Sequence, residues 1–175
     1  MSQASAIENH PRVVRVREAL TTHGILDRIV VLPDSARTAS AAADALGCNV
    51  AQIANSLVFR LVNSNRALLV LSSGAKRVDL TRLAVIVGEP VGKANAAFVR
   101  ETTGFAIGGV APVGHELPIR RLVERSLFAF SEIWAAAGHP NTVFRLSPGE
   151  LVRIASADIV EVAEARARFG SCPRR

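Results

Sequence analysis

The stretch SLVFRLVNSNRALLVLS, residues 56–72, indicates the fold class most directly. Ser56–Val62 and Arg66–Ser72 are apolar runs typical of strands, and Asn63-Ser64-Asn65 between them predicts a three-residue hairpin loop. A second hairpin is predicted over residues 132–146. A purely doubly wound sheet would not contain hairpins at these places. With helices scattered between the strands, the pattern predicts an α+β fold with a mixed, largely antiparallel β-sheet flanked by helices.

On either side of this hairpin, the helices are predicted from N-cap residues at their starts and glycines at their ends. The predicted helices are His10–His23, Thr38–Leu46 with Thr38 as N-cap, Leu80–Val87 capped by Asp79, Lys93–Thr103, and a helix to about Ala155 opened by the capping box Ser147-Pro148-Gly149-Glu150. The remaining strands are predicted at Arg28–Leu32, Glu132–Ala137, Thr142–Leu146 and Ile159–Val162, while Arg120–Phe130 fits either helix or strand.

Length and charge favour one domain with a basic tail. The chain has 175 residues and is 49% hydrophobic, which suits a single domain over residues 1–165. The net charge is +6, but residues 166–175 hold four arginines and no acid, leaving 17 basic and 15 acidic residues elsewhere. This tail suits either contact with a phosphate backbone or a solvated chain end. Charge alone therefore does not establish nucleic-acid binding.

The sequence predicts a cytoplasmic protein without a membrane span or a zinc site. Its longest apolar stretches stop at five residues, and the N-terminus lacks the basic and apolar pattern of a secretory signal. Cys48 and Cys172 have no CxxC spacing, and no histidine has a His or Cys partner three or four residues away. These observations indicate free thiols in a reducing compartment and no zinc site.

Two glycine-containing loops are the local candidates for a functional site. Gly108–Gly114 has three glycines in seven residues, which permit close approach of the main chain to a ligand. His115 and His139 each follow a glycine in a predicted loop, and loops often carry function. The chain has no P-loop, no GxGxxG after a strand and no GxSxG elbow. Composition and spacing therefore do not name a reaction.

Several segments, taken in order, resemble the YbaK family, which includes the editing domain inserted in bacterial prolyl-tRNA synthetases. They are Thr38–Gly47, Gln52–Phe59 (QIANSLVF), Arg77-Val78-Asp79, Thr103–Gly114 (TGFAIGGVAPVG), Ala137-Gly138-His139-Pro140-Asn141 and Leu146-Ser147-Pro148. The resemblance covers about residues 10–163. It implies a YbaK-like fold, no metal or organic cofactor, and hydrolysis of the ester between a wrong amino acid and the 3′ adenosine of a tRNA. The implied partner is the acceptor end of a mischarged tRNA, and an aminoacyl-tRNA synthetase is a second candidate partner.

The resemblance also implies a site. The residues that match positions at the reacting ester are Asn55, Gly108 and Gly109, and those that match substrate-binding positions are Ser56, Gly138, His139 and Pro140. Small residues let the main chain line a narrow pocket, and pocket size then sets specificity. Ordinary tight turns would equally explain the glycines, and a solvated loop residue would explain His139.

Asn55 departs from the family, which usually has lysine at this position. An amide can hydrogen-bond a carbonyl or ribose, but it cannot neutralise a phosphate. Three alternatives stay open: Asn55 positions substrate in a variant deacylase, Lys76 or Arg77 supplies the missing charge, or the domain binds without hydrolysing. As a structural alternative, Asn55 caps the start of the following strand.

Three hypotheses of function follow. The first is a trans-editing aminoacyl-tRNA deacylase, and the second is a non-catalytic module that binds tRNA or a synthetase. The third is hydrolysis of a small acyl compound unrelated to tRNA, which the nearly balanced charge of the main domain would allow. The sequence leaves the amino acid, the tRNA and the oligomeric state open.

Overall fold

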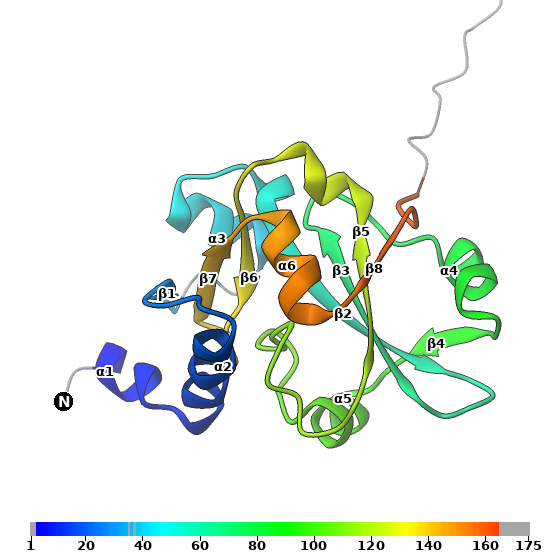
Figure 1. The fold of residues 1–175 in the computed structure, drawn as a ribbon, viewed down its shortest axis with the longest axis horizontal. Helices are drawn as coiled ribbons and strands as arrows, with labels where there is room; N and C mark the ends of the chain where they lie inside the picture. The colour runs from blue at the N-terminus through cyan, green and yellow to red at the C-terminus, as the bar shows by residue number, and fades with distance from the viewer. Residues whose placement is uncertain (1–2, 35, 37, 165–175) are drawn as a thin grey trace, which may run out of the picture.

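A mixed β-sheet forms the centre of the molecule (Figure 1). The computed structural model describes residues 3–34, 36 and 38–164, and within them the sheet has eight strands. The strands are β1 (Ile29–Val31), β2 (Ile53–Leu61), β3 (Ala67–Ser73), β4 (Val91–Lys93), β5 (Arg120–Glu124), β6 (Ile133–Ala136), β7 (Thr142–Leu146) and β8 (Asp158–Val160). Their order is β1-β7-β6-β2-β3-β5-β8, and β4 also pairs with β2.

Strand pairing confirms the predicted fold class. Four pairs are antiparallel (β1–β7, β2–β3, β2–β4 and β6–β7), and three are parallel (β2–β6, β3–β5 and β5–β8). The first predicted hairpin is β2–β3, in which Asn55 lies opposite Ser72 and Arg60 opposite Ala67. The second is β6–β7, closed by the loop at residues 137–141.

Helices are found at all five predicted segments, and one further helix, Gln3–Glu8, was not predicted. They are α1 (Gln3–Glu8), α2 (Pro11–Thr22), α3 (Ala39–Leu46), α4 (Leu80–Val87), α5 (Ala96–Thr103) and α6 (Pro148–Ala155), with 3₁₀ turns η1 (Val50–Gln52) and η2 (Arg125–Ala129). Thr38 and Asp79 cap α3 and α4 through side-chain oxygens, as predicted. Gly47 and Gly88 end the same helices in the left-handed conformation.

The prediction for residues 93–103 was wrong at its start. Val91–Lys93 forms β4 against Phe59–Leu61 of β2, so α5 begins only at Ala96, after Asn95 caps it. Pairing with a strand 30 residues earlier is a tertiary contact that local propensity does not report. The ambiguous segment Arg120–Phe130 contains both a strand, β5, and the 3₁₀ turn η2.

The strand β3 is covered on both faces, which explains its unbroken apolar run. Leu69 and Leu71 belong to the largest buried cluster, with Phe105 and Phe144. Leu68 and Val70 point to a second cluster on the other face, under α4. A strand buried on both faces reads as a continuous hydrophobic stretch and not as an alternation.

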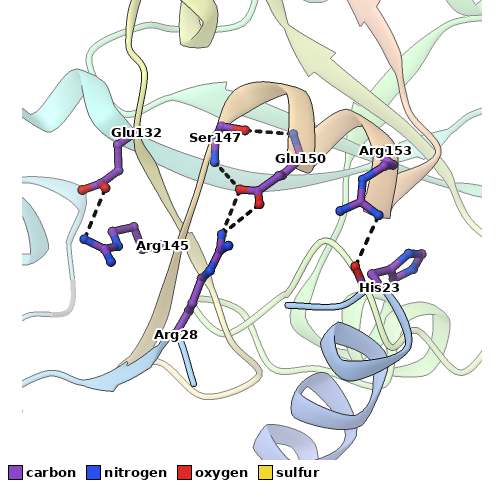
Figure 2. A network of polar contacts seen from close by, with 7 residues as sticks. All are labelled: His23, Arg28, Glu132, Arg145, Ser147, Glu150 and Arg153. Carbon is purple, nitrogen blue, oxygen red and sulfur yellow. Dashed lines mark hydrogen bonds and ion pairs between the residues drawn. The ribbon is translucent and has the colours of Figure 1, made fainter. Parts of the chain in front are cut away.

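The capping box of α6 is also a tertiary link (Figure 2). The Ser147 hydroxyl accepts a hydrogen bond from the Glu150 main-chain N–H at 3.1 Å, and Glu150 accepts one from the Ser147 N–H at 2.8 Å. Arg28, next to β1, donates to both oxygens of the same carboxylate at 3.0 and 2.9 Å. The pKa of Glu150 is lowered chiefly by this hydrogen bond from Arg28. The strongest local signal of the sequence therefore joins α6 to the edge of the sheet.

Two further observations concern the predictions about a membrane span and about the C-terminal tail. Among the described residues, no helix is long and apolar enough to cross a membrane. The basic tail, residues 166–175, and the predicted domain boundary at residue 165 lie outside the described residues. Both therefore stay predictions.

Candidate functional site

The strand β2 has a gap in its pairing where the candidate site lies. On the edge away from β3, Ile53–Ala54 pairs in parallel with Trp134–Ala135 of β6, and Phe59–Leu61 pairs with β4. Within the described part of the chain, residues 55–58 between them pair with no strand on that edge. Main-chain groups at such an edge are open to hydrogen bonding with another molecule.

A cavity of about 360 Å³ opens beside this gap. It is lined by α3, by strands β2, β6 and β7, and by the three loops that hold Leu32 and Ala36, Ile107 and Gly108, and Pro140. Its lining residues are Leu32, Ala36, Thr38, Ala39, Ala42, Ile53, Ala54, Asn55, Ser56, Leu57, Ile107, Gly108, Trp134, Ala136, Pro140, Thr142 and Val143. Every side chain in this set is apolar or uncharged. We call this cavity the uncharged pocket.

Asn55 and Ser56 are the polar side chains that β2 contributes to the uncharged pocket. Asn55 is exposed, whereas the Ser56 hydroxyl is buried and has no hydrogen-bond partner. The Ser72 hydroxyl, opposite Asn55 in the β2–β3 register, is likewise buried and without a partner. Buried polar groups are normally satisfied, and of these two hydroxyls the one that lines the uncharged pocket is that of Ser56, where a ligand or water would satisfy it.

The structure excludes the alternative that Asn55 caps the start of a strand. β2 begins at Ile53 and not at Ser56, because Ile53 and Ala54 already pair with β6. Gln52, which precedes the strand, reinforces this pairing by donating a hydrogen bond to the Glu132 carbonyl at 3.0 Å. Asn55 is therefore the third residue of a paired strand.

The loop between β6 and β7 is tightly bonded to itself. The His139 main-chain N–H donates to Thr142 Oγ1 at 3.1 Å, and the Thr142 N–H donates to the His139 carbonyl at 2.9 Å. The Asn141 N–H donates to His139 Nδ1 at 3.1 Å. These bonds fix the main chain of the loop that supplies Pro140 and Thr142 to the uncharged pocket.

Glycines let this loop approach two other segments. A side chain at Gly138, whose φ is +98°, would place its Cβ 2.6 Å from the Arg12 carbonyl oxygen in α2. A Cβ at Gly109 would lie 3.0 Å from main-chain atoms of His139. Both glycines therefore permit close packing of the main chain. Between them they bring α2, the loop at residues 137–141 and the loop at residue 109 together.

The His139 side chain lies against His10 of the α2 N-cap. Their ring centroids are 5.4 Å apart. Burial lowers the pKa of His139, and the nearby His10 and Arg12 lower it further, while Asp34 acts in the opposite direction. His139 is therefore neutral at pH 7. Its Nδ1 accepts a hydrogen bond, so the ring proton is assigned to Nε2.

The structure brings four of the predicted site residues into one cavity: Asn55, Ser56, Gly108 and Pro140 all line the uncharged pocket. The other three, Gly109, Gly138 and His139, are absent from its lining and support the adjoining loops. Lys76 and Arg77, considered as substitutes for the missing family lysine, do not line it either. His115, the other loop histidine, packs edge-on against Phe105, away from this pocket.

Asn141 is a positioning residue that the sequence reasoning missed. It is 5% exposed, and its side-chain amide donates to the Pro33 carbonyl at 3.0 Å and to Asp34 Oδ1 at 3.3 Å. The Leu32 N–H in turn donates to the Asn141 carbonyl at 2.6 Å. Asn141 thereby holds the segment around Leu32, which lines the pocket, against the loop that supplies Pro140. Its partners lie more than 100 residues away, so no local signal reports them.

These features define the class as an α+β domain with a small, uncharged ligand pocket at a break in its sheet. The chain belongs to the aminoacyl-tRNA editing domain family, whose model matches residues 33–154. This match confirms the resemblance to the YbaK family and shows a role in aminoacyl-tRNA editing.

The chain is also similar to individual proteins, one of which is described in terms of trans-editing. The chain is 43% identical to a protein of known crystal structure described as a candidate trans-editing enzyme for prolyl-tRNA synthetase, with a TM-score of 0.83 over 89% of this chain and 99% of that one. The hypothetical protein APE2540 is 30% identical, with a TM-score of 0.79 over 86% and 99% of the two chains. The uncharacterized protein YwhH of Bacillus subtilis (strain 168) is 30% identical over 117 residues, or 67% of this chain and 74% of YwhH.

Proposed function

We propose that this protein is a trans-editing deacylase that hydrolyses the ester of a mischarged tRNA in the uncharged pocket. Water adds to the ester carbonyl, the bond from the carbonyl carbon to the ribose oxygen breaks, and that oxygen takes up a proton. The observation that carries the proposal is the convergence of Asn55, Ser56, Gly108 and Pro140 on one cavity in a chain of the editing family.

The lining of the pocket suits recognition of an uncharged aminoacyl group. Alanines 36, 39 and 42 and Ile53 form apolar walls, and a cavity of about 360 Å³ is at the small end of ligand pockets. Among the described lining residues none is titratable, so the polar contacts come from amides and hydroxyls. We infer that the substrate's ribose hydroxyl helps to orient the water and that main-chain N–H groups near residues 55–58 and 108 stabilise the developing oxyanion.

We assign Asn55 to positioning of the ester or ribose by hydrogen bonds. Its side chain is exposed at the unpaired part of β2, and no protein group competes for its amide among the described residues. Loss of one such hydrogen bond costs about 0.5–1.5 kcal/mol, so Asn55→Ala should lower kcat/KM by about two- to twelvefold. Asn63→Ala, in the exposed hairpin turn, is the matched control and should leave the rate unchanged.

The experiment is a panel of mischarged tRNAs incubated with the purified protein, with release of the amino acid measured against buffer alone. At least one pair should lose its amino acid faster than in buffer, and that pair is then used for the Asn55 variants. A panel in which no pair responds contradicts the enzymatic proposal. An unchanged rate in Asn55→Ala removes this residue from the site.

The second candidate is a module that binds aminoacyl-tRNA without hydrolysing it, and the asparagine at position 55 is the observation in its favour. Deacylation by the Asn55→Lys variant, compared with the natural chain, distinguishes the binding module from the deacylase. If the natural chain is inactive and the lysine variant hydrolyses ester, the binding module is the better description. If both chains hydrolyse ester, asparagine is a working substitute.

A further inference from the structure

A second cavity, of about 420 Å³, lies between α2 and the end of α5. Its lining residues are His10, Pro11, Arg12, Arg15, Arg100, Gly104 and Glu116. We call it the arginine cavity. It adjoins the loop that also supplies the uncharged pocket, because the His139 ring contacts His10 and Gly138 packs on the Arg12 carbonyl.

Positive charge in the arginine cavity exceeds the negative charge that the protein provides there. The only carboxylate among its lining residues is Glu116, which pairs with Arg15 at 2.8 Å. Arg12 and Arg100 form no ion pair with any described residue, and Arg15 Nη1 is buried without a hydrogen-bond partner. Guanidinium groups present planar sets of donors that match phosphate oxygens, so an anion would satisfy these groups.

The local backbone makes room for these guanidinium groups. Gly104 ends α5 in the left-handed conformation, with φ +77°. A Cβ at this position would lie 2.8 Å from Arg15 Nη1 and 2.9 Å from the Glu116 side chain. The glycine that terminates α5 therefore also allows Arg15 Nη1 to lie against the end of this helix, whose Arg100 lines the same cavity.

We propose that the arginine cavity binds phosphates of the RNA backbone next to the aminoacylated 3′ end, an inference that rests on the proposed function of the uncharged pocket. The loop at residues 138–140 contacts both cavities, so an RNA whose 3′ end occupies the uncharged pocket needs to cross only this loop to reach the arginines. The RNA backbone next to the 3′ end carries one phosphate per nucleotide. Backbone recognition of this kind is independent of sequence and depends strongly on salt.

The test is fluorescence anisotropy with a labelled RNA stem-loop that ends in single-stranded CCA and carries no amino acid. Arg12→Gln/Arg100→Gln should bind about tenfold more weakly than the natural chain at low salt. The slope of log K against log salt should fall by about 0.7–0.9 for each phosphate that the variant no longer binds. Circular dichroism and thermal unfolding check that the double variant is folded.

The matched control removes two arginines from a different cavity. Arg66 and Arg120 line a cavity of about 500 Å³ at the far end of the β2–β3 hairpin. Arg66→Gln/Arg120→Gln changes the net charge equally, and we expect its affinity for the RNA to stay within twofold of the natural chain. An equal loss in both double variants would show a general effect of charge and overturn the proposal.

The remaining outcomes separate this site from the function on which it rests. If the natural chain hydrolyses mischarged tRNA but the Arg12/Arg100 variant binds RNA with unchanged affinity and slope, the phosphate site is wrong and the deacylase stands. If the RNA result is as expected and no tRNA is deacylated, the phosphate site stands and the hydrolysis fails. Thermal stabilisation by inorganic phosphate that the double variant loses, without loss of RNA binding, would indicate a free-anion site and contradict the proposal.

Discussion

The uncharged pocket and the arginine cavity adjoin one loop and differ in every respect that matters for recognition. The first is lined by alanines, other apolar side chains and uncharged polar groups, and the second by three arginines and one glutamate. Pro140 faces the first, while Gly138 and His139 contact residues of the second. We therefore expect size and hydrogen bonding to select the ligand of the uncharged pocket, and charge to hold the ligand of the arginine cavity.

The largest expected effect is a loss of stability on substitution of Gly138, in the loop between the two cavities. Gly138→Ala places a Cβ against the Arg12 carbonyl in a left-handed backbone, so we expect a loss of about 3 kcal/mol or more in the free energy of unfolding. Urea unfolding measures it. Gly149→Ala is the control, because nothing lies closer than 3.9 Å to its Cβ, and it should be neutral. Equal stability of the two variants would show that the loop does not depend on this contact.

The second-largest expected effect is a loss of deacylation without a loss of RNA binding, which would show that the two cavities act independently. Ala136 lines the uncharged pocket from β6, and Ala136→Leu fills part of its volume without touching the arginines. We expect kcat/KM for deacylation to fall at least about tenfold, which is about 1.4 kcal/mol, while affinity for the uncharged RNA stem-loop changes less than twofold. Ala45→Leu, on the exposed face of α3, is the control. A parallel loss of RNA affinity would mean that the two cavities are not independent.

The smallest expected effect is the contribution of His139, in the loop between the two cavities, to the pH dependence of RNA affinity. The pKa of His139 is lowered, chiefly by burial, so the residue is neutral at pH 7 and gains a proton as the pH falls. This adds a positive charge beside His10 and Arg12, so RNA affinity should rise about threefold more in the natural chain than in His139→Gln when the pH is lowered from 7.5 to below the lowered pKa of His139. Anisotropy at both pH values measures it, and identical pH profiles would contradict the placement of His139.

The same shift has a consequence for stability. Because the folded state holds the proton on His139 less tightly than the unfolded state, its contribution to stability is present at neutral pH and is lost as the pH falls below the ordinary histidine pKa. Tighter RNA binding and lower stability at acid pH are therefore expected together.

The elements predicted from the sequence are those governed by near neighbours. The caps at Thr38 and Asp79, the capping box at Ser147 and the hairpin over residues 56–72 each depend on a few adjacent residues, and the structure confirms all four. The short strand β4 was missed because tertiary contacts, chiefly its pairing with β2, support it. The family resemblance also came from the sequence, since the order of its segments can be recognised without coordinates.

The candidate site also has one part that the sequence predicts and another that only the tertiary structure shows. The sequence alone was enough to predict the fold class and to select Asn55, Ser56, Gly108 and Pro140, which line one cavity. The tertiary structure was needed to show that Gly109, Gly138 and His139 support the walls, that Asn141 ties the loop to the segment at Leu32, and that Arg12, Arg15 and Arg100 gather beside it. The physical reason is how far apart in the sequence the interacting residues lie. Caps and turns are settled by bonds within a few residues, whereas a cavity exists only where segments distant in the chain stop short of filling the space between them.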